Sequence, residues 1–377
     1  MKIVLSGLGT TNKGAELMLY AILQQIELKY PQAEVFISKK SVRPEYVDTR
    51  ISLKYKPYSK WKAIAIRSKI RGIFRILHLP THIFSDTTVV ENADYFIDGS
   101  GFVFSDQWNL NFSALYYWEH ILRSYHEQGT KIIFLPQAFG PVEKEFTRKI
   151  ISCIDKYADV VMPREMVSKN YLAQCFINQD KIKLFTDFTS LVEGRFPEKY
   201  ASLRDAVCII PNMRMIDKGM ISMEDYLAAL LRIVRLAKSY GKQVYLLNHE
   251  GMADEKLAFS VQQHLNDNIE VVTGLNALEV KGLIASSFLC ITSRFHGVAS
   301  ALNSCVPCLA TSWSHKYEEL FRDYGLENSI LELNNVDDKI VEYLQPENNR
   351  LIRQHLEKQV TKIKEQTSQM WKIVWNE

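Results

Sequence analysis

The chain has 377 residues, of which 47% are hydrophobic and 24% are charged, and its formal net charge is +3. This length predicts two domains, and the small net charge argues against a nucleic-acid-binding protein, which normally carries a strongly basic domain. The six cysteines are too few for a disulfide scaffold and fit a reducing compartment. Because the sequence shows neither a signal-peptide pattern nor a run of about twenty apolar residues, we expect a cytoplasmic location.

The first half of the sequence alternates between apolar strand patterns and amphipathic helix patterns. It predicts a strand at 2–6, a glycine-bearing turn at 7–14 and a helix at 15–29. Further strands are predicted at 35–38, 95–97, 131–135 and 160–162, with helices near 115–127 and 147–157. Such alternation is typical of a parallel sheet covered by helices on both faces.

One region of this half stands apart by its charge. Between Asp48 and Asp86 there is no acidic residue but there are nine basic ones: Arg50, Lys54, Lys56, Lys60, Lys62, Arg67, Lys69, Arg71 and Arg75. Tryptophan, isoleucine, phenylalanine and leucine side chains are interleaved with them. We call residues 50–78 the basic segment, and its composition predicts a helix lying on an anionic membrane surface. The alternative is a solvated basic helix or loop packed on the first domain.

The second half repeats the alternation. Strands are predicted at 206–210, 243–247, 269–272 and 288–292, with helices at 223–240, 254–265, 277–285 and after His296. Residues 193–197 interrupt the pattern, so we place an N-terminal domain at 1–195 and a C-terminal domain at 196–345. The remaining segment, 346–377, contains a predicted polar helix near 348–375. We expect this helix to pack back on the first domain.

The segment from Ile291 to Pro307 places an arginine and a histidine two residues apart between a strand and a small-residue helix. Backbone N–H groups at a helix N-terminus favour negative charge. The guanidinium of Arg294 is suited to a carboxylate or a phosphate, and His296 can exchange a proton near neutral pH. The segment therefore predicts an anion-binding turn, with a surface salt bridge beside a core histidine as the alternative.

Six stretches, in chain order, resemble the polysaccharide pyruvyl transferase family. They are Asn12-Lys13-Gly14, Asp94 to Gly101, Leu135 to Pro141, Pro163 to Glu165, the turn Ser293 to Gly297 with Val306-Pro307, and Ser314 to Glu327. The sequence departs from the family's usual pattern at Gly14-Ala15-Glu16, where members often have Gly-Asp, and at Gly99-Ser100-Gly101, where three glycines are common.

The resemblance implies an α/β protein with two Rossmann-like domains facing across a cleft, as in the GT-B architecture. The first domain is the acceptor side and the second is the donor side. The implied reaction transfers the enolpyruvyl group of phosphoenolpyruvate to two hydroxyls of one sugar, which gives a pyruvate ketal and phosphate. Such transfer belongs to the synthesis of bacterial capsule, exopolysaccharide or cell-wall polysaccharide, with a lipid-linked saccharide as acceptor and galactose favoured.

The partners expected from this resemblance are phosphoenolpyruvate as co-substrate, the lipid-linked acceptor and the inner face of the cytoplasmic membrane, where the protein is peripheral. No nucleic acid and no cofactor are expected. No metal site is expected either, because the histidines are scattered and no carboxylate cluster has ligand-like spacing.

The implied chemistry needs cations for the donor's phosphate and carboxylate and a general acid for its methylene carbon. We assign the catalytic roles to Arg294 for anion binding and His296 for proton transfer. The candidates for donor binding are Ser293, Arg164, Arg214, His315, Lys316, His249 and Glu250. The candidates for acceptor binding are Asn12, Lys13, Gly14, Asp98, Ser100 and Gln137.

Structural roles are the alternatives for several of these residues. Arg164 can form an ion pair with Glu165 at a helix start, Asn12-Lys13-Gly14 can cap a helix, and Asp98-Gly99 is a common turn. Two other functions also remain open. One is a GT-B glycosyltransferase that uses a nucleotide sugar, although no base slot with a ribose-binding carboxylate is found in the second half. The other is a non-catalytic relative that binds saccharide.

Overall fold

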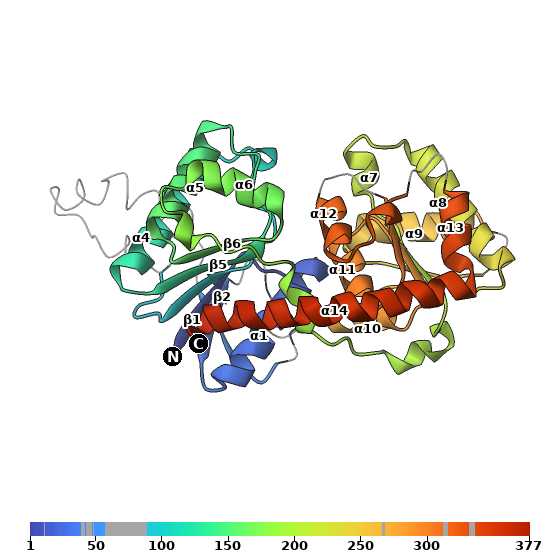
Figure 1. Cartoon of the computed structure of the whole chain (residues 1–377), viewed down its shortest axis with the longest axis horizontal. Helices are drawn as coiled ribbons and strands as arrows, with labels where there is room; N and C mark the ends of the chain where they lie inside the picture. Colours follow the sequence, from blue (N-terminus) through green and yellow to red (C-terminus); the bar gives the residue numbers. More distant parts are fainter. Residues whose placement is uncertain are drawn as a thin grey trace. The chain divides into compact units, whose positions relative to one another are not determined.

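The computed structural model describes residues 1–10, 12–38, 42, 47, 49–56, 89–265, 268–311, 316–331 and 336–377. The chain forms two compact units (Figure 1). Unit 1 comprises Met1–Thr10, Ile22–Phe188 and Ile373–Glu377, and unit 2 comprises Thr11–Ala21 and Thr189–Lys372. Residues 12–21, which the sequence analysis assigned to the N-terminal domain, thus group with unit 2.

Unit 1 is built on a parallel sheet with the strand order β3-β2-β1-β4-β5-β6. Its strands are β1 (Lys2–Ser6), β2 (Glu34–Ser38), β3 (Ser52–Lys56), β4 (Tyr95–Asp98), β5 (Lys131–Gln137) and β6 (Val160–Pro163). Its helices are the C-terminal part of α1 (Lys13–Lys29), α4 (Phe112–Glu127), α5 (Glu145–Tyr157) and α6 (Met166–Cys175). This order is that of a Rossmann fold, whose ligands bind beyond the strand ends where the order reverses, here between β1 and β4.

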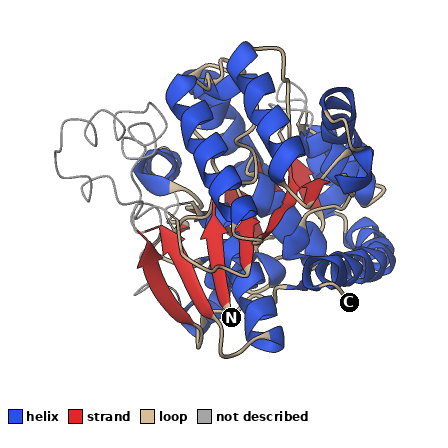
Figure 2. Ribbon diagram, turned by 90° about the vertical axis from the view of Figure 1, so that its left-hand side faces the viewer, coloured by secondary structure: helices blue, strands red, loops and turns tan. Residues whose placement is uncertain are grey.

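Helices cover both faces of this sheet (Figure 2). On one face, Phe96 and Phe134 pack with Ile121 of α4 and Ile154 of α5. Tyr95 points to the opposite face, because side chains alternate along a strand. There its ring meets the ring of Trp375, in the last turn of α14 (Pro346–Trp375), edge-on with centroids 5.4 Å apart. The end of the chain therefore packs on the strands of unit 1.

The basic segment begins with a strand rather than a helix. Residues 52–56 form β3, which pairs with β2 from Glu34↔Ser52 to Ser38↔Lys56, and Lys54 forms an ion pair with Glu34. The prediction of a membrane-lying helix is therefore wrong for these residues, because Ser-Leu-Lys-Tyr-Lys alternates with the period of a strand. The remainder of the predicted helix, 57–78, lies outside the described residues.

Unit 2 contains a second parallel sheet, with the order β11-β10-β7-β8-β9. Its strands are β7 (Val207–Ile210), β8 (Val244–Leu247), β9 (Glu270–Val272), β10 (Leu289–Thr292) and β11 (Cys308–Ala310). Its helices are α7 (Arg214–Asp217), α8 (Met223–Ser239), α9 (Gly251–Gln263), α10 (Ala277–Ala285), α11 (Phe295–Asn303), α12 (Lys316–Asp323), α13 (Asp337–Leu344) and most of α14. If β7 is numbered as the first strand of this unit, the strand order read from β9 to β11 is 3-2-1-4-5. This is again the order of a Rossmann fold.

Alternate residues of these strands bury against two helical layers. Cys208, Tyr245 and Cys290 pack in a core with side chains of α10, α11, α12 and α14. Leu246 and Ile291 point the other way and pack with side chains of α8, α9 and α13. Because each sheet is parallel and covered by helices, the predicted class, α/β with two Rossmann-like domains, is confirmed.

Candidate functional site

Three neighbouring strands of unit 2 end at the same edge of the sheet. β7 lies between β8 and β10, so the residues that follow these strands are brought together. They include Asn212 after β7, His249 and Glu250 after β8, and Ser293 and Arg294 after β10. This edge includes the point between β7 and β10 where the strand order reverses, the usual place for a ligand in an open α/β sheet.

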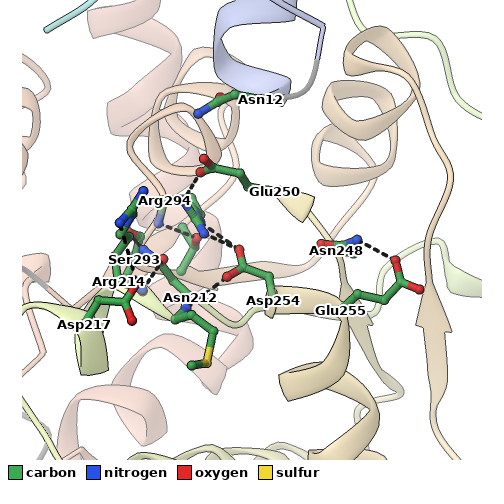
Figure 3. Close-up of polar contacts among 12 residues, drawn as sticks. Asn12, Asn212, Arg214, Asp217, Asn248, Glu250, Asp254, Glu255, Ser293 and Arg294 are labelled. Carbon is green, nitrogen blue, oxygen red and sulfur yellow. Dashed lines mark hydrogen bonds and ion pairs between the residues drawn. The ribbon is translucent and has the colours of Figure 1, made fainter. Parts of the chain in front are cut away.

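Arg294, the residue preceding α11, forms ion pairs with two carboxylates (Figure 3). Its Nε donates a hydrogen bond of 2.9 Å to Asp254 Oδ2, and its Nη2 also contacts that oxygen. Its Nη1 contacts Glu250 Oε2. The side chains of Arg294 and Asp254 are 11% and 1% exposed, whereas that of Glu250 is 28% exposed. A mostly buried guanidinium is thus oriented by one buried and one partly exposed carboxylate.

The backbone beneath Arg294 is fixed by buried hydrogen bonds. The carbonyl of Ser293 accepts hydrogen bonds of 2.6 Å from Asn212 Nδ2 and from the hydroxyl of Tyr317. Asp254 Oδ1 accepts a hydrogen bond of 2.9 Å from the backbone N–H of Met213. These contacts join the ends of β7 and β10 to α9 and α12, so the turn that carries Arg294 is held in place from several elements. Ser293 acts here mainly through its carbonyl, although its Oγ lies 3.4 Å from the hydroxyl of Tyr226.

His296 lies in the first turn of α11, which begins one residue earlier, at Phe295. Gly14, in the first turn of α1, packs against the imidazole: a Cβ atom at Gly14 would lie 2.8 Å from His296 Cγ. Since real Cβ atoms do not approach so closely, only glycine fits beside this ring without a shift. The N-terminal motif and the Ser-Arg-Phe-His-Gly turn therefore meet within unit 2.

Asn12 and Lys13 approach the same region. Asn12 Oδ1 accepts hydrogen bonds from the backbone N–H groups of Gly14 at 2.8 Å and Ala15 at 3.3 Å, and its backbone forms an antiparallel β-bridge with Glu250. Lys13 Nζ pairs with buried Glu16 at 2.6 Å. The helix-capping role considered for Asn12 is thus present, and the acceptor-binding role of Asn12, Lys13 and Gly14 stays a prediction.

His249 is the most perturbed titratable group at this edge. It is buried, and its Nδ1 has no hydrogen-bond partner in the part of the chain that the structure describes. Burial holds the pKa of His249 well below the ordinary 6.5, and the nearby charges of Arg294, His296 and Lys13 lower the pKa further. The imidazole is therefore neutral at neutral pH.

This lowered pKa predicts a loss of stability in acid. The unfolded chain binds a proton at His249 near pH 6.5, whereas the folded chain does so only at lower pH. Neutral His249 therefore contributes fully to the free energy of unfolding above about pH 6.5. As the pH falls below that value the contribution is lost, and the free energy of unfolding decreases by at most about 1.4 kcal/mol per pH unit. Urea unfolding of the wild type and His249→Gln at pH 7.5 and 5.5 checks this. Equal acid sensitivity of the two proteins would refute the assignment.

Three predicted acceptor residues form a second polar cluster, in unit 1. Asp98, at the end of β4, accepts hydrogen bonds from Ser100 N at 3.1 Å, Ser100 Oγ at 2.9 Å and Gln137 Nε2 at 3.1 Å. Burial raises the pKa of Asp98 above its ordinary value. Gly7, with φ +76°, lies so close that a Cβ atom there would be 2.6 Å from Ser100 N. The cluster lies at the carboxyl ends of β4 and β5, next to the point between β1 and β4 where the strand order of unit 1 reverses.

Arg164 follows β6 in unit 1 and is buried beside Glu165, with Nε 3.6 Å from Glu165 Oε2. The ion pair considered as its structural alternative is thus present. Glu165 Oε1 also accepts a hydrogen bond from Ser168 Oγ in α6. A role for Arg164 in donor binding stays a prediction.

The other donor candidates are in unit 2 or outside the described residues. Arg214 begins α7, is 48% exposed and lies 3.5 Å from Asp217. Lys316 begins α12, with Nζ 5.8 Å from the ring centroid of Phe295. His315 lies outside the described residues. Phe295 is adjacent to both Arg294 and His296, so Lys316 lies near the turn. Arg214 instead pairs with Asp217 of its own helix, α7.

Comparison with known protein families shows which family these sequence motifs belong to. The family model described as polysaccharide pyruvyl transferase matches residues 12–315. The chain belongs to this family. The resemblance seen in the sequence is thereby confirmed, and the protein is a member of a transferase family. None of the curated proteins matches the chain.

Solved structures similar to this pyruvyl transferase family member have the GT-B-like fold of nucleotide-sugar enzymes. Anabaena HepE in complex with UDP and glucose has 10% identity and a TM-score of 0.62, covering 99% of this chain and 98% of its own. UDP-GlcNAc 2-epimerase from Neisseria meningitidis bound to UDP-GlcNAc has 11% identity and a TM-score of 0.57, covering 98% and 100%. S. aureus MnaA with UDP has 13% identity and a TM-score of 0.56, covering 95% and 91%. At these identities the likeness shows the fold alone.

The described residues of this family member contain neither a metal-binding cluster nor a membrane-spanning helix. No group of three or more histidine, cysteine, aspartate or glutamate side chains there could hold a metal ion. None of the helices there is both long and apolar enough to span a bilayer.

Sequence reasoning missed two residues that shape the surroundings of Arg294 and Ser293. Asp254 was placed at the start of a predicted helix and lies in the first turn of α9, which begins three residues earlier, where it pairs with Arg294. Asn212 was considered only as part of a turn, yet it joins β7 to Ser293. The sequence carried no signal for either contact, because both join residues that only the tertiary fold brings together.

Proposed function

We propose that this protein is a ketal-forming pyruvyl transferase, which moves the enolpyruvyl group of phosphoenolpyruvate onto two hydroxyls of one sugar. The supporting observation is that Arg294, His296 and His249 converge at the carboxyl edge of the sheet of unit 2 in a member of this family. The guanidinium of Arg294 is suited to anion binding, and the two histidine side chains are suited to proton transfer, so both functions are available at one edge of the sheet.

The proposed reaction uses these groups as follows. Arg294 binds the donor's phosphate or carboxylate. His296 gives a proton to the methylene carbon, while a sugar hydroxyl attacks C2 and loses its own proton to a base. A second hydroxyl of the same sugar then attacks C2 and passes its proton to the departing phosphate, as the bond from C2 to the phosphate oxygen breaks with its electron pair leaving on phosphate. Cationic groups stabilise the charge that develops on phosphate, so the chemistry balances without an oxidant or a reductant.

Two polar sets are candidates for acceptor recognition, each considered within its own unit: Asn12 to Gly14 in unit 2, and Asp98, Ser100 and Gln137 in unit 1. Amide and carboxylate groups suit hydroxyl recognition, since each can accept or donate hydrogen bonds. We propose a lipid-linked precursor of a bacterial surface polysaccharide, with galactose as the favoured sugar.

The identity of the donor separates this function from nucleotide-sugar transfer, which is the alternative because solved structures of similar fold contain UDP. Thermal unfolding with phosphoenolpyruvate, UDP-glucose or UDP-N-acetylglucosamine measures donor binding directly, because a ligand of the folded state raises the unfolding temperature. We expect stabilisation by phosphoenolpyruvate, with phosphate release once a suitable saccharide is added. Stabilisation by a UDP-sugar alone would move the assignment to a GT-B glycosyltransferase.

We also propose that the protein binds the cytoplasmic membrane surface through the part of the basic segment that follows β3. We expect co-sedimentation with vesicles containing anionic lipid at low salt and release at high salt, since salt screens charge attraction. Neutral vesicles serve as the control. Failure to sediment with anionic vesicles at low salt would reject this membrane contact.

A further inference from the structure

We infer that Glu250 occupies part of the donor's place on Arg294 in the donor-free protein and is displaced by the donor's anionic group. The inference rests on the proposed function only for the identity of the anion. Glu250 would then tune how strongly the site binds anions, in addition to any contact that it makes with the donor.

The two carboxylates on Arg294 differ in how firmly they are held. Asp254 is 1% exposed, receives Nε and Nη2 of Arg294 through one oxygen, and receives the backbone N–H of Met213 through the other. Glu250 is 28% exposed and contacts Arg294 only through Nη1. Within the described residues this is the only hydrogen bond of the Glu250 carboxylate. Asp254 is therefore the fixed partner of Arg294, and Glu250 is the one that can leave.

The two carboxylates on Arg294 favour the departure of one of them when an anion binds. Arg294 faces two carboxylates, and the neighbouring Lys13 is already paired with Glu16. His249 is kept neutral by its lowered pKa. A further anion placed on Arg294 would lie next to both carboxylates, and like charges repel strongly in a site of low exposure. Withdrawal of Glu250 frees Nη1 and removes the nearest negative charge at the same time.

The backbone allows this withdrawal without local unfolding. Glu250 precedes the first residue of α9, but its side chain forms no capping hydrogen bond, so the helix does not depend on the carboxylate. Its main chain is held by the β-bridge to Asn12. Figure 3 shows the carboxylate reaching down to Arg294 from the segment that faces Asn12. Only side-chain rotation is needed to expose Nη1.

The test compares anion binding by the wild type, Glu250→Gln and Glu255→Gln. Glutamine keeps the size of Glu250 but removes the charge. Glu255 is a matched control, because it is a glutamate only five residues further along the chain, in α9, and its carboxylate accepts a hydrogen bond of 3.0 Å from Asn248 Nδ2 instead of contacting Arg294. Calorimetric titration with inorganic phosphate and with phosphoenolpyruvate gives the dissociation constants. We expect Glu250→Gln to bind both anions about three- to fivefold more tightly than the wild type, because a partly exposed negative charge that competes for Arg294 is removed. Glu255→Gln should have the dissociation constants of the wild type.

A merely structural role of Glu250 would weaken binding or leave it unchanged, so either result overturns the inference. Absence of anion binding by both the wild type and Glu250→Gln overturns it as well. Equal tightening in Glu255→Gln would indicate a general charge effect and would also refute displacement at Arg294. Tighter phosphate binding by Glu250→Gln without any use of phosphoenolpyruvate would keep the displacement and reject the proposed donor, so the two failures are distinguishable.

Discussion

His296→Ala is expected to lower the rate of phosphoenolpyruvate-dependent phosphate release by about 10²- to 10⁴-fold, the usual contribution of a positioned general acid. The imidazole lies in the first turn of α11 beside Arg294 and against Gly14, and alanine supplies no proton. Steady-state kinetics with saturating acceptor measures the effect. Circular dichroism and the unfolding temperature report whether the fold is intact.

A second variant tests the same role without removing the imidazole. Gly14→Ala places a methyl group where the ring of His296 now lies, so the ring must move and turnover should fall. His264→Ala is the matched control, because His264 is an exposed histidine of unit 2 whose ring forms a hydrogen bond with the backbone carbonyl of Ser260 and with none of the proposed site residues that the structure describes. Wild-type turnover by a folded His296→Ala protein would remove this residue from catalysis.

Arg294→Lys is expected to lower kcat/KM for phosphoenolpyruvate by about 100-fold, the cost of losing a charge-assisted pair of hydrogen bonds. The guanidinium reaches Asp254 through Nε and Nη2 while Nη1 points to Glu250, and a single ammonium cannot keep both directions. Initial rates at varied donor concentration measure the loss.

The control for this change is Arg232→Lys in α8, an exposed arginine paired with Asp337 at 2.5 Å. It makes the same substitution in the same unit, away from the site, and should leave kcat/KM unchanged. If Arg294→Lys retained the wild-type Michaelis constant and rate, the planar fork of Arg294 would have no part in donor binding.

Most of the fold followed from sequence periodicity. The strand at 2–6 and the helix at 277–285 were predicted with the bounds that the structure has, because their apolar patterns are clear and their ends carry turn or capping residues. β3 and β11 were missed. β3 lies in the basic segment, where the charge pattern suggested a helix, and β11 has only three residues, too few to show a period.

The candidate site was less accessible to sequence reasoning. The positions of Arg294 and His296 after a strand could be predicted, since motif and topology agree there. The packing of Gly14 on His296 could not, because it joins residues far apart in the chain and depends on α1 beginning in unit 2. The sequence likewise gave no sign that Arg294 is shared by Asp254 and Glu250, since a charge pattern does not specify which carboxylates converge on one arginine.

The most direct test of the proposed activity is mass spectrometry of the saccharide after incubation with phosphoenolpyruvate. The acceptors are a panel of lipid-linked galactosides, glucosides and N-acetylmannosaminides, with the wild type and His296→Ala run in parallel. We predict that one acceptor gains the mass of pyruvate minus water in the wild-type reaction only, with one phosphate released for each product. Transfer of a sugar from a nucleotide donor to these acceptors, with no mass gain from phosphoenolpyruvate, would contradict the account.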